Sequence, residues 1–186
     1  MIDSPLSAPQ PLNKYHDIID FDCGIQALNE YLKKYALQNQ LSQGVKNYVV
    51  TRENKVVGYF SLVFGSVSFE NAPNRLRQGL SHHPIPILLL ARLAVDQREK
   101  GKGLGKALLK EALLKTIRAS EIAGLRAILV HAKDNSAKTF YQHFGFQSFA
   151  SEGFTLYLLI KDIRKNLNIE CQISTFIAPI AVLDET

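Results

Sequence analysis

The amino-acid sequence predicts an α/β domain built around one mixed β-sheet. Two observations lead to this fold class. Apolar runs typical of strands alternate with amphipathic helical segments along the chain. In addition, the nearly continuous apolar run 84–95 has the pattern of a strand buried on both faces, and a glycine-rich loop, a helix and a second apolar run at 126–131 follow it. That order predicts a strand–helix–strand crossover whose loop lies at the carboxyl end of a strand, where α/β proteins bind ligands.

The first part of the sheet precedes the apolar run. Residues 25–41 place apolar side chains at three- and four-residue spacings and predict one amphipathic helix. The β-rich runs 48–51 and 56–64 flank a polar turn and predict a hairpin, whose second strand the pattern allows to continue to residue 69. A polar loop, 70–83, follows. The predicted apolar face of the helix consists of Ile25, Leu28, Leu32, Tyr35 and Ala36.

The second part of the sheet follows the glycine-rich loop. Residues 106–123 separate apolar from charged side chains on a helical wheel and predict a helix. After the strand at 126–131, a short helix is expected around 136–144, and the run 154–160 predicts a closing strand.

One globular domain accounts for most of the chain. Its 186 residues are about 1.2 times the length of a common domain, and 46% apolar against 21% charged residues exclude disorder for most of it. We divide the chain into an N-terminal arm (1–14) that contains three prolines, a domain (15–164) and a C-terminal extension (165–186). The extension is too apolar for a free linker, and packing on the body and packing on another subunit are both open.

The composition also bears on compartment and partners. No run of about 18 apolar residues and no signal-peptide pattern occurs, so we expect a cytoplasmic protein without membrane association. Cys23 and Cys171 lie far apart and indicate no disulfide framework. The adjacent His82 and His83 have no carboxylate or cysteine at ligand spacing, so we expect no metal. The net charge of +5, from 22 Lys and Arg against 17 Asp and Glu, favours a polyanionic partner without requiring one.

The loop after the buried strand contains Gly101, Gly103 and Gly105 and opens a helix. Because the amides at a helix start are unpaired and the dipole end is positive, this loop predicts an anion site that the neighbouring lysines reinforce. A flexible basic loop is the simpler alternative. The spacing GxGxG differs from the dinucleotide fingerprint GxGxxG. A P-loop is excluded because it needs four residues between its outer glycines and a Ser or Thr where Ala107 stands.

Two motifs together indicate a family. The loop matches Arg-x-x-Gly-x-Gly at Arg98, Gly101 and Gly103, and the segment 135–146 contains an Asn, then Phe-Tyr, then Gly-Phe. These residues resemble the GNAT acetyltransferase family, whose loop for the pyrophosphate of acetyl-CoA has the pattern Gln/Arg-x-x-Gly-x-Gly/Ala. The resemblance covers residues 12–162. It implies the GNAT fold, a mixed and mostly antiparallel central sheet flanked by helices, and acetyl-CoA as cosubstrate.

The resemblance can be narrowed with the segments 21–24, 28–32 and 91–96, which read FDCG, LNEYL and ARLAVD. They are similar to the GNAT toxins of bacterial type II toxin–antitoxin modules. That similarity implies acetylation of the α-amino group of the amino acid on a charged tRNA, which blocks translation. It also implies a small ribbon-helix-helix antitoxin as partner, whose C-terminal tail wraps the toxin, and we expect a homodimer.

The family resemblance assigns roles to individual residues. Tyr141 would protonate the departing thiolate, and the backbone of Leu93, Ala94 and Val95 would hold the pantetheine arm and the acetyl carbonyl. Asn135 would hydrogen-bond the pantetheine. The pyrophosphate would be held by Arg98, Lys100, Gly101, Lys102, Gly103, Leu104, Gly105 and Lys106.

Several of these residues have simpler interpretations. Without the resemblance, Tyr141 is a core tyrosine with its hydroxyl at the rim. His131 ends a strand near the cleft and could act as a base, but a rim histidine is the simpler interpretation. An α-amino group next to an ester is also less basic than a lysine amine, so a strong base is not obligatory.

The remaining basic residues could hold tRNA phosphates or form an ordinary solvated surface. Arg92 is the least ordinary of them, because a charge within an apolar strand is costly unless it is paired or faces a cleft. Two other functions stay open: acetylation of a small amine or a protein N-terminus, and a non-catalytic CoA-binding module. Binding of tRNA would separate the first from the toxin, and absence of turnover would mark the second. The candidates for tRNA contact are Lys33, Lys34, Arg75, Arg77 and Arg92.

Overall fold

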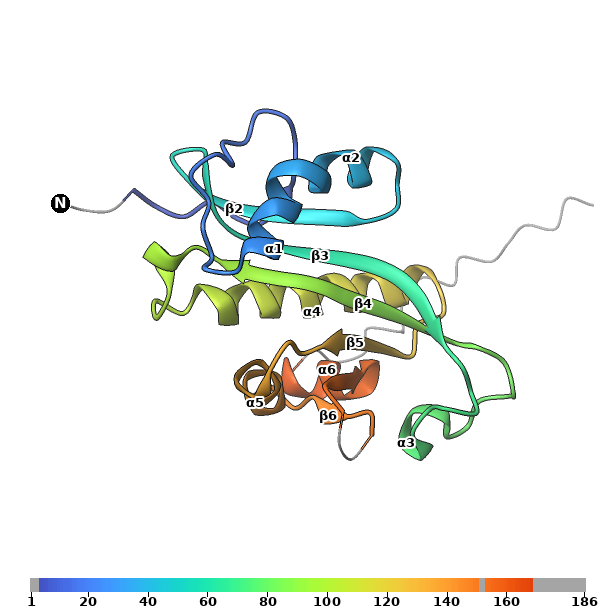
Figure 1. Ribbon diagram of the computed structural model, residues 1–186. Helices are drawn as coiled ribbons and strands as arrows, with labels where there is room; N and C mark the ends of the chain where they lie inside the picture. The colour runs from blue at the N-terminus through green and yellow to red at the C-terminus, as the bar shows by residue number, and fades with distance from the viewer. Residues whose placement is uncertain (1–3, 151–152, 169–186) are drawn as a thin grey trace, which may run out of the picture.

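The protein, seen in a computed structural model that describes residues 4–150 and 153–168, contains a seven-stranded sheet in the order β1-β2-β3-β4-β5-β7-β6 (Figure 1). Only β4 and β5 are parallel, and every other neighbouring pair is antiparallel. The expected mixed, mostly antiparallel sheet is confirmed. The strands are β1 (Gln10–Pro11), β2 (Lys46–Arg52), β3 (Lys55–Val67), β4 (Ile85–Val95), β5 (Ala127–His131), β6 (Gln147–Ser148) and β7 (Thr155–Leu159).

Helices cover both faces of this sheet. In Figure 1, α1 and α2 lie on one side of β2 and β3, and α4 lies on the other. The crossover from β4 through α4 to β5 is confirmed, with α4 starting two residues earlier than predicted. The helical segments are α1 (Gln26–Glu30), the π-helical turn η1 (Tyr31–Tyr35), α2 (Ala36–Leu41), α3 (Asn74–Arg77), the 3-10 turn η2 (Gln97–Glu99), α4 (Leu104–Ile122), α5 (Asn135–His143) and α6 (Ile160–Asn166).

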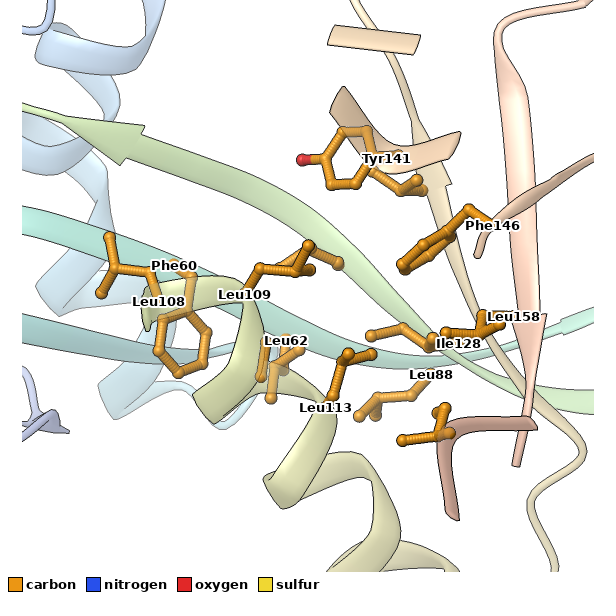
Figure 2. Close-up of a cluster of buried hydrophobic side chains, with 14 of the residues drawn as sticks. Phe60, Leu62, Leu88, Leu108, Leu109, Leu113, Ile128, Tyr141, Phe146 and Leu158 are labelled. Carbon is orange, nitrogen blue, oxygen red and sulfur yellow. The ribbon is translucent and has the colours of Figure 1, made fainter. Parts of the chain in front are cut away.

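The main core lies between α4 and the sheet. Leu108, Leu109 and Leu113 of α4 pack with Phe60 and Leu62 of β3, as Figure 2 shows. Tyr59, the residue before Phe60, points to the opposite face and belongs to the cluster under α1 and α2, as the alternation of side chains along a strand requires. The buried side chains therefore fix α4, and with it the glycine-rich loop that leads into it, against the middle of the sheet.

The helical segment after residue 25 differs from the prediction of one regular helix. Its middle part is the π-helical turn, in which the hydrogen-bond spacing takes in an extra residue and rotates the face that meets the sheet. Tyr31 is therefore buried, whereas Tyr35, which the three- and four-residue spacing assigned to the apolar face, is 54% exposed. The prediction for Tyr35 was wrong for that reason.

Some short elements were not predicted. Within the 1–14 arm, β1 pairs with the edge of β2, and Leu12 next to it is buried. The predicted polar loop contains α3. The carbonyls of Leu76 in α3 and of Gln78 just after it accept hydrogen bonds from the Arg126 side chain. Beyond residue 168 the C-terminal extension lies outside the described residues. Among the residues that are described, no helix is long and apolar enough to cross a membrane.

Asn47 connects the first helical layer to the sheet. It is fully buried on β2 and donates from Nδ2 to the carbonyl of Ala36 at 2.7 Å. Its Oδ1 accepts hydrogen bonds from Tyr31 Oη at 3.1 Å and from Ser61 Oγ at 2.6 Å. A buried amide with three satisfied contacts holds the π-helical turn in register with β2 and β3.

Replacing Asn47 by Ala should destabilise the fold by about 3 kcal/mol, because the three partners would remain buried without a hydrogen bond. The chain contains no Trp, so urea unfolding should be followed by circular dichroism. Asn39→Ala, on the exposed side of α2, is the control and should stay within about 0.5 kcal/mol of wild type. A loss below about 1 kcal/mol for Asn47→Ala would contradict the anchoring role.

Candidate active site

A β-bulge in β4 opens the sheet. Leu90 pairs with Leu62 and Arg92 with Ser61, so Ala91 is an extra residue in β4. The parallel pairing of β4 with β5 ends at the same place, at Leu90 and Val130. Because a bulge bends its strand, the last part of β4 separates from β5 beyond this point.

Two adjoining cavities occupy this region and form one cleft. The loop-side cavity, of about 580 Å³, is bordered by Gly101, Gly105 and the last residues of β4. The bulge-side cavity, of about 320 Å³, is bordered by the bulge at Ala91 and by His131. The residues that line both are Ile25, Leu28, Leu93, Lys133, Ala137 and Tyr141.

The glycine-rich loop has the backbone geometry of an anion site. Gly101 and Gly103 have φ values of 78° and 83°, and Gly103 is the N-cap of the 19-residue helix α4. The first helical hydrogen bond runs from the Ala107 amide to the Gly103 carbonyl, so the amides of residues 104–106 have no helical acceptor. Free amides at a helix start, with the exposed Lys106 beside them, favour binding of a phosphate group.

The other charged side chains of the loop are engaged within the protein. Arg98 Nε and Nη2 each lie 2.8 Å from a carboxylate oxygen of Asp96. Lys100 Nζ donates to the Cys23 carbonyl at 2.8 Å, and Lys102 Nζ lies 3.4 Å from Glu99 Oε2. The family resemblance assigned these three cations to the pyrophosphate, but their contacts within the protein stabilise the conformation of the loop. The geometry favours the backbone amides as the anion ligands.

Asp96 is the centre of the contacts that hold the loop. It is 1% exposed, and burial by itself would raise its pKa. Hydrogen bonds from the Arg98 side chain and from the amides of Asp22 and Arg98 outweigh burial and lower the pKa to about 2. Gln97 adds a contact from its Nε2 to Asp22 Oδ2 at 2.8 Å. The segment 20–24 is therefore fastened to the loop by charge-assisted hydrogen bonds that sequence spacing did not reveal.

Tyr141 stands at the junction of the two cavities. Its ring packs 5.4 Å from the ring of Phe146 and is 7% exposed, and Figure 2 shows the hydroxyl pointing away from the buried cluster. Burial raises the pKa of Tyr141 to about 12. The hydroxyl makes no hydrogen bond to another described residue. It can therefore donate a proton into the cleft at neutral pH, but it is poorly suited to act as a base.

The structure places other predicted cleft residues as follows. Leu93 lines both cavities, and Ala94 and Val95 line the loop-side cavity. Asn135 is exposed at the start of α5 and lines neither cavity, although its neighbour Ser136 lines the loop-side one. Asn135 thus lies at the rim.

The five predicted tRNA-contacting residues do not gather at one place. Arg92 lines the bulge-side cavity, with its guanidinium 3.5 Å above the centre of the Tyr31 ring. Arg75 and Arg77 lie on α3, at the opposite end of the β3–β4 pair from the glycine-rich loop (Figure 1). Arg75 Nη1 lies 2.9 Å from Asp162 Oδ2, so Arg75 forms an ion pair that connects α3 to α6.

The other two candidates, Lys33 and Lys34, are exposed on the π-helical turn. Lys34 lies 3.6 Å from Glu30. Lys133, which lines both cavities, is a further basic residue of the cleft. The described part of the chain contains no group of three or more side chains suited to bind a metal.

Comparison with known proteins agrees with this geometry. The family model described as "Acetyltransferase (GNAT) domain" matches residues 43–148. The chain belongs to the GNAT acetyltransferase family, which confirms the resemblance seen in its sequence. It is 42% identical over 161 residues to a tRNA-acetylating toxin of Mycobacterium tuberculosis, covering 87% of this chain and 96% of the relative.

Two solved structures are similar over most of their length. AtaT complexed with acetyl-methionyl-tRNAfMet matches with a TM-score of 0.81 and 26% identity, covering 88% of this chain and 99% of that one. The AtaT Y144F mutant toxin bound to the C-terminus of the antitoxin AtaR and acetyl-CoA matches with a TM-score of 0.75 and 25% identity, covering 89% and 99%.

Gly103→Glu should abolish binding of acetyl-CoA without unfolding the protein. The positive φ of 83° strains any side chain at this position, but the side chain would meet no described atom within 4 Å and would obstruct a ligand that approaches the amides. Gly79→Glu is the matched control, because Gly79 also has a positive φ, of 77°, and open space around it, but lies near α3. Calorimetry should show loss of affinity for Gly103→Glu alone, and equal affinities in both variants would refute the assignment.

Proposed function

We propose that this protein is a toxin that transfers the acetyl group of acetyl-CoA to the α-amino group of an aminoacyl-tRNA and thereby blocks translation. The observation that carries the proposal is the 42% identity to a tRNA-acetylating toxin over 96% of that toxin's length. The structure of AtaT with acetyl-methionyl-tRNAfMet supports the same product chemistry for a chain of this fold.

The loop-side cavity is the proposed acetyl-CoA site. Its residues fit the cosubstrate: the amides at the start of α4 suit the pyrophosphate, with Lys106 beside them. The backbone of Leu93, Ala94 and Val95, on the part of β4 that has left β5, offers hydrogen-bonding groups to the pantetheine arm. Asn135 would reach that arm from the rim. Acetyl-CoA, when bound there, supplies the activated acetyl group.

The bulge-side cavity is the proposed acceptor site. Arg92 and Lys133 present positive charge there. The exposed Lys33 and Lys34 lie on the π-helical turn that follows α1, the helix that borders the cavity. Such charges would hold the phosphates near the 3′ end of the tRNA. Tyr141, which faces both cavities, would donate its proton to the departing thiolate while the amine attacks from the acceptor side.

The proposed partner is a small ribbon-helix-helix antitoxin whose C-terminal tail binds the toxin. This is supported by the structure of AtaT with the C-terminus of its antitoxin. We further propose a homodimer that acts in the cytoplasm, where charged tRNA occurs, and that needs no metal.

Incubation with labelled acetyl-CoA and bulk charged tRNA should label aminoacyl-tRNA. Binding of tRNA should weaken steeply with salt because phosphate counterions are released, whereas binding of acetyl-CoA should change less. Arg92→Gln should lower the slope of log affinity against log salt by about one, and Arg77→Gln, on α3, should leave it unchanged. Labelled small amines or protein N-termini with unlabelled tRNA would instead support a different acetyltransferase.

Tyr141→Phe should leave folding and acetyl-CoA affinity nearly intact, because the ring and its packing remain. Turnover should fall by about 10²- to 10⁴-fold, as is typical for loss of a general acid, and expression should no longer arrest growth. Tyr157→Phe removes a hydroxyl from a buried tyrosine outside the cleft and serves as control. A wild-type rate for Tyr141→Phe, with chemistry limiting, would assign the proton to water or another residue.

A further inference from the structure

His131 has a fixed orientation at the edge of the acceptor side. It is the last residue of β5, one position beyond the end of the pairing with β4. On its other side it is the cross-strand partner of Thr155 in β7. The imidazole Nδ1 lies 2.9 Å from Thr155 Oγ1, so the neighbouring strand restrains the ring. His131 lines the bulge-side cavity together with Tyr141.

Among the side chains that line the bulge-side cavity, His131 is the one that can accept a proton at neutral pH. Arg92 faces it from β4, Lys133 from the segment after β5, and Tyr141 from α5, whereas α1 contributes apolar side chains. No carboxylate of a described residue lines the cavity, and Asp134 lies 3.0 Å from Lys133 on the loop side. Guanidinium and ammonium groups ordinarily keep their protons at neutral pH, and so does a buried phenol, so none of these groups can accept a proton from the amine. An imidazole is the side chain that exchanges a proton in this range.

We propose that His131 is the base that takes the proton from the acceptor amine, and that Thr155 positions it. This inference rests on the proposed function. In the tautomer with hydrogen on Nδ1, the imidazole donates to Thr155 Oγ1, and the lone pair of Nε2 remains available.

The proposed step is balanced. The amine nitrogen forms a bond to the acetyl carbonyl carbon, and His131 Nε2 accepts the proton that this nitrogen must lose. The carbon–sulfur bond breaks, and Tyr141 gives its phenolic proton to the departing sulfur. One proton enters at His131 and one leaves from Tyr141, and both side chains return to their starting states by exchange with solvent.

The test is the pH profile of acetyl transfer to charged tRNA in single turnovers. In the wild type, two groups must be deprotonated, the bound amine and His131, so the rate on the acid side should fall by about 100-fold per pH unit. His131→Gln should be slower by about 10²- to 10⁴-fold at neutral pH, and its rate should fall by only about tenfold per pH unit. Affinity for acetyl-CoA, measured by calorimetry, should not change.

Two further variants separate catalysis from packing. Thr155→Val keeps the size of the side chain and the imidazole but removes Oγ1, so the rate should drop by about tenfold while both ionisations remain. His143→Gln is the matched control, because His143 packs against Phe144 at the end of α5 and lines neither cavity. It should behave as wild type.

A wild-type rate and both ionisations in His131→Gln would overturn the proposal and return His131 to the rim. If His131→Gln also loses affinity for acetyl-CoA, the rate of Thr155→Val becomes the test. A wild-type rate for Thr155→Val would overturn the positioning role of Thr155. Failure of the wild type to acetylate charged tRNA would contradict the proposed function instead. The same profiles would then be measured with the amine that the wild type does acetylate.

Discussion

The constraint on which the cleft depends is the extra residue in β4. At Ala91 the strand gains one residue against β3, and at the adjacent position it stops pairing with β5. Buried backbone groups need hydrogen-bond partners, and the last residues of β4 have lost the partners that β5 would supply. The core under α4 holds the rest of the strand in place. The sheet is therefore rigid around an opening whose wall includes polar backbone groups.

In the glycine-rich loop, side chains and backbone have different roles: the basic side chains stabilise the loop, and the backbone amides are available to a ligand. Arg98 neutralises Asp96, and Lys102 together with Arg52 of β2 neutralises Glu99. Both carboxylates are buried, and a buried carboxylate without a cation would be costly. Ion pairs within the protein therefore stabilise the loop, while the amides at the start of α4 have no helical acceptor and remain available to a ligand. Ligand binding by backbone amides costs little side-chain entropy, because the amides are already ordered.

Periodicity predicted the long elements because their burial pattern is local. The strand at 85–95 and the helix at 104–122 show it within a single window of sequence. The π-helical turn was not predicted, because an extra residue in a helical turn changes the spacing of the buried side chains and leaves no local sequence pattern at Tyr35. The short helix α3 was not predicted, because a hydrogen bond from Arg126, about 50 residues away along the chain, stabilises its C-terminal end.

The same distinction applies to the site. The motif at Gly101 and Gly103 could be identified from spacing, and Tyr141 from the family segment. The bond from the Asp22 amide to Asp96 joins residues 74 positions apart, and that between His131 and Thr155 joins residues 24 apart. Such pairs depend on the strand order, which pattern alone does not determine. For the same reason Arg75 and Arg77 could not be distinguished from Arg92 before the fold was known.

The contact between segment 20–24 and the loop also joins the two sides of the cleft mechanically. This segment is fastened to Asp96 and Gln97, and a residue later the chain enters α1, whose Leu28 lines both cavities. The same hydrogen bonds therefore hold the loop and this wall of the cleft in one position relative to each other. A substitution at Asp96, which lines neither cavity, would therefore alter the shape of both.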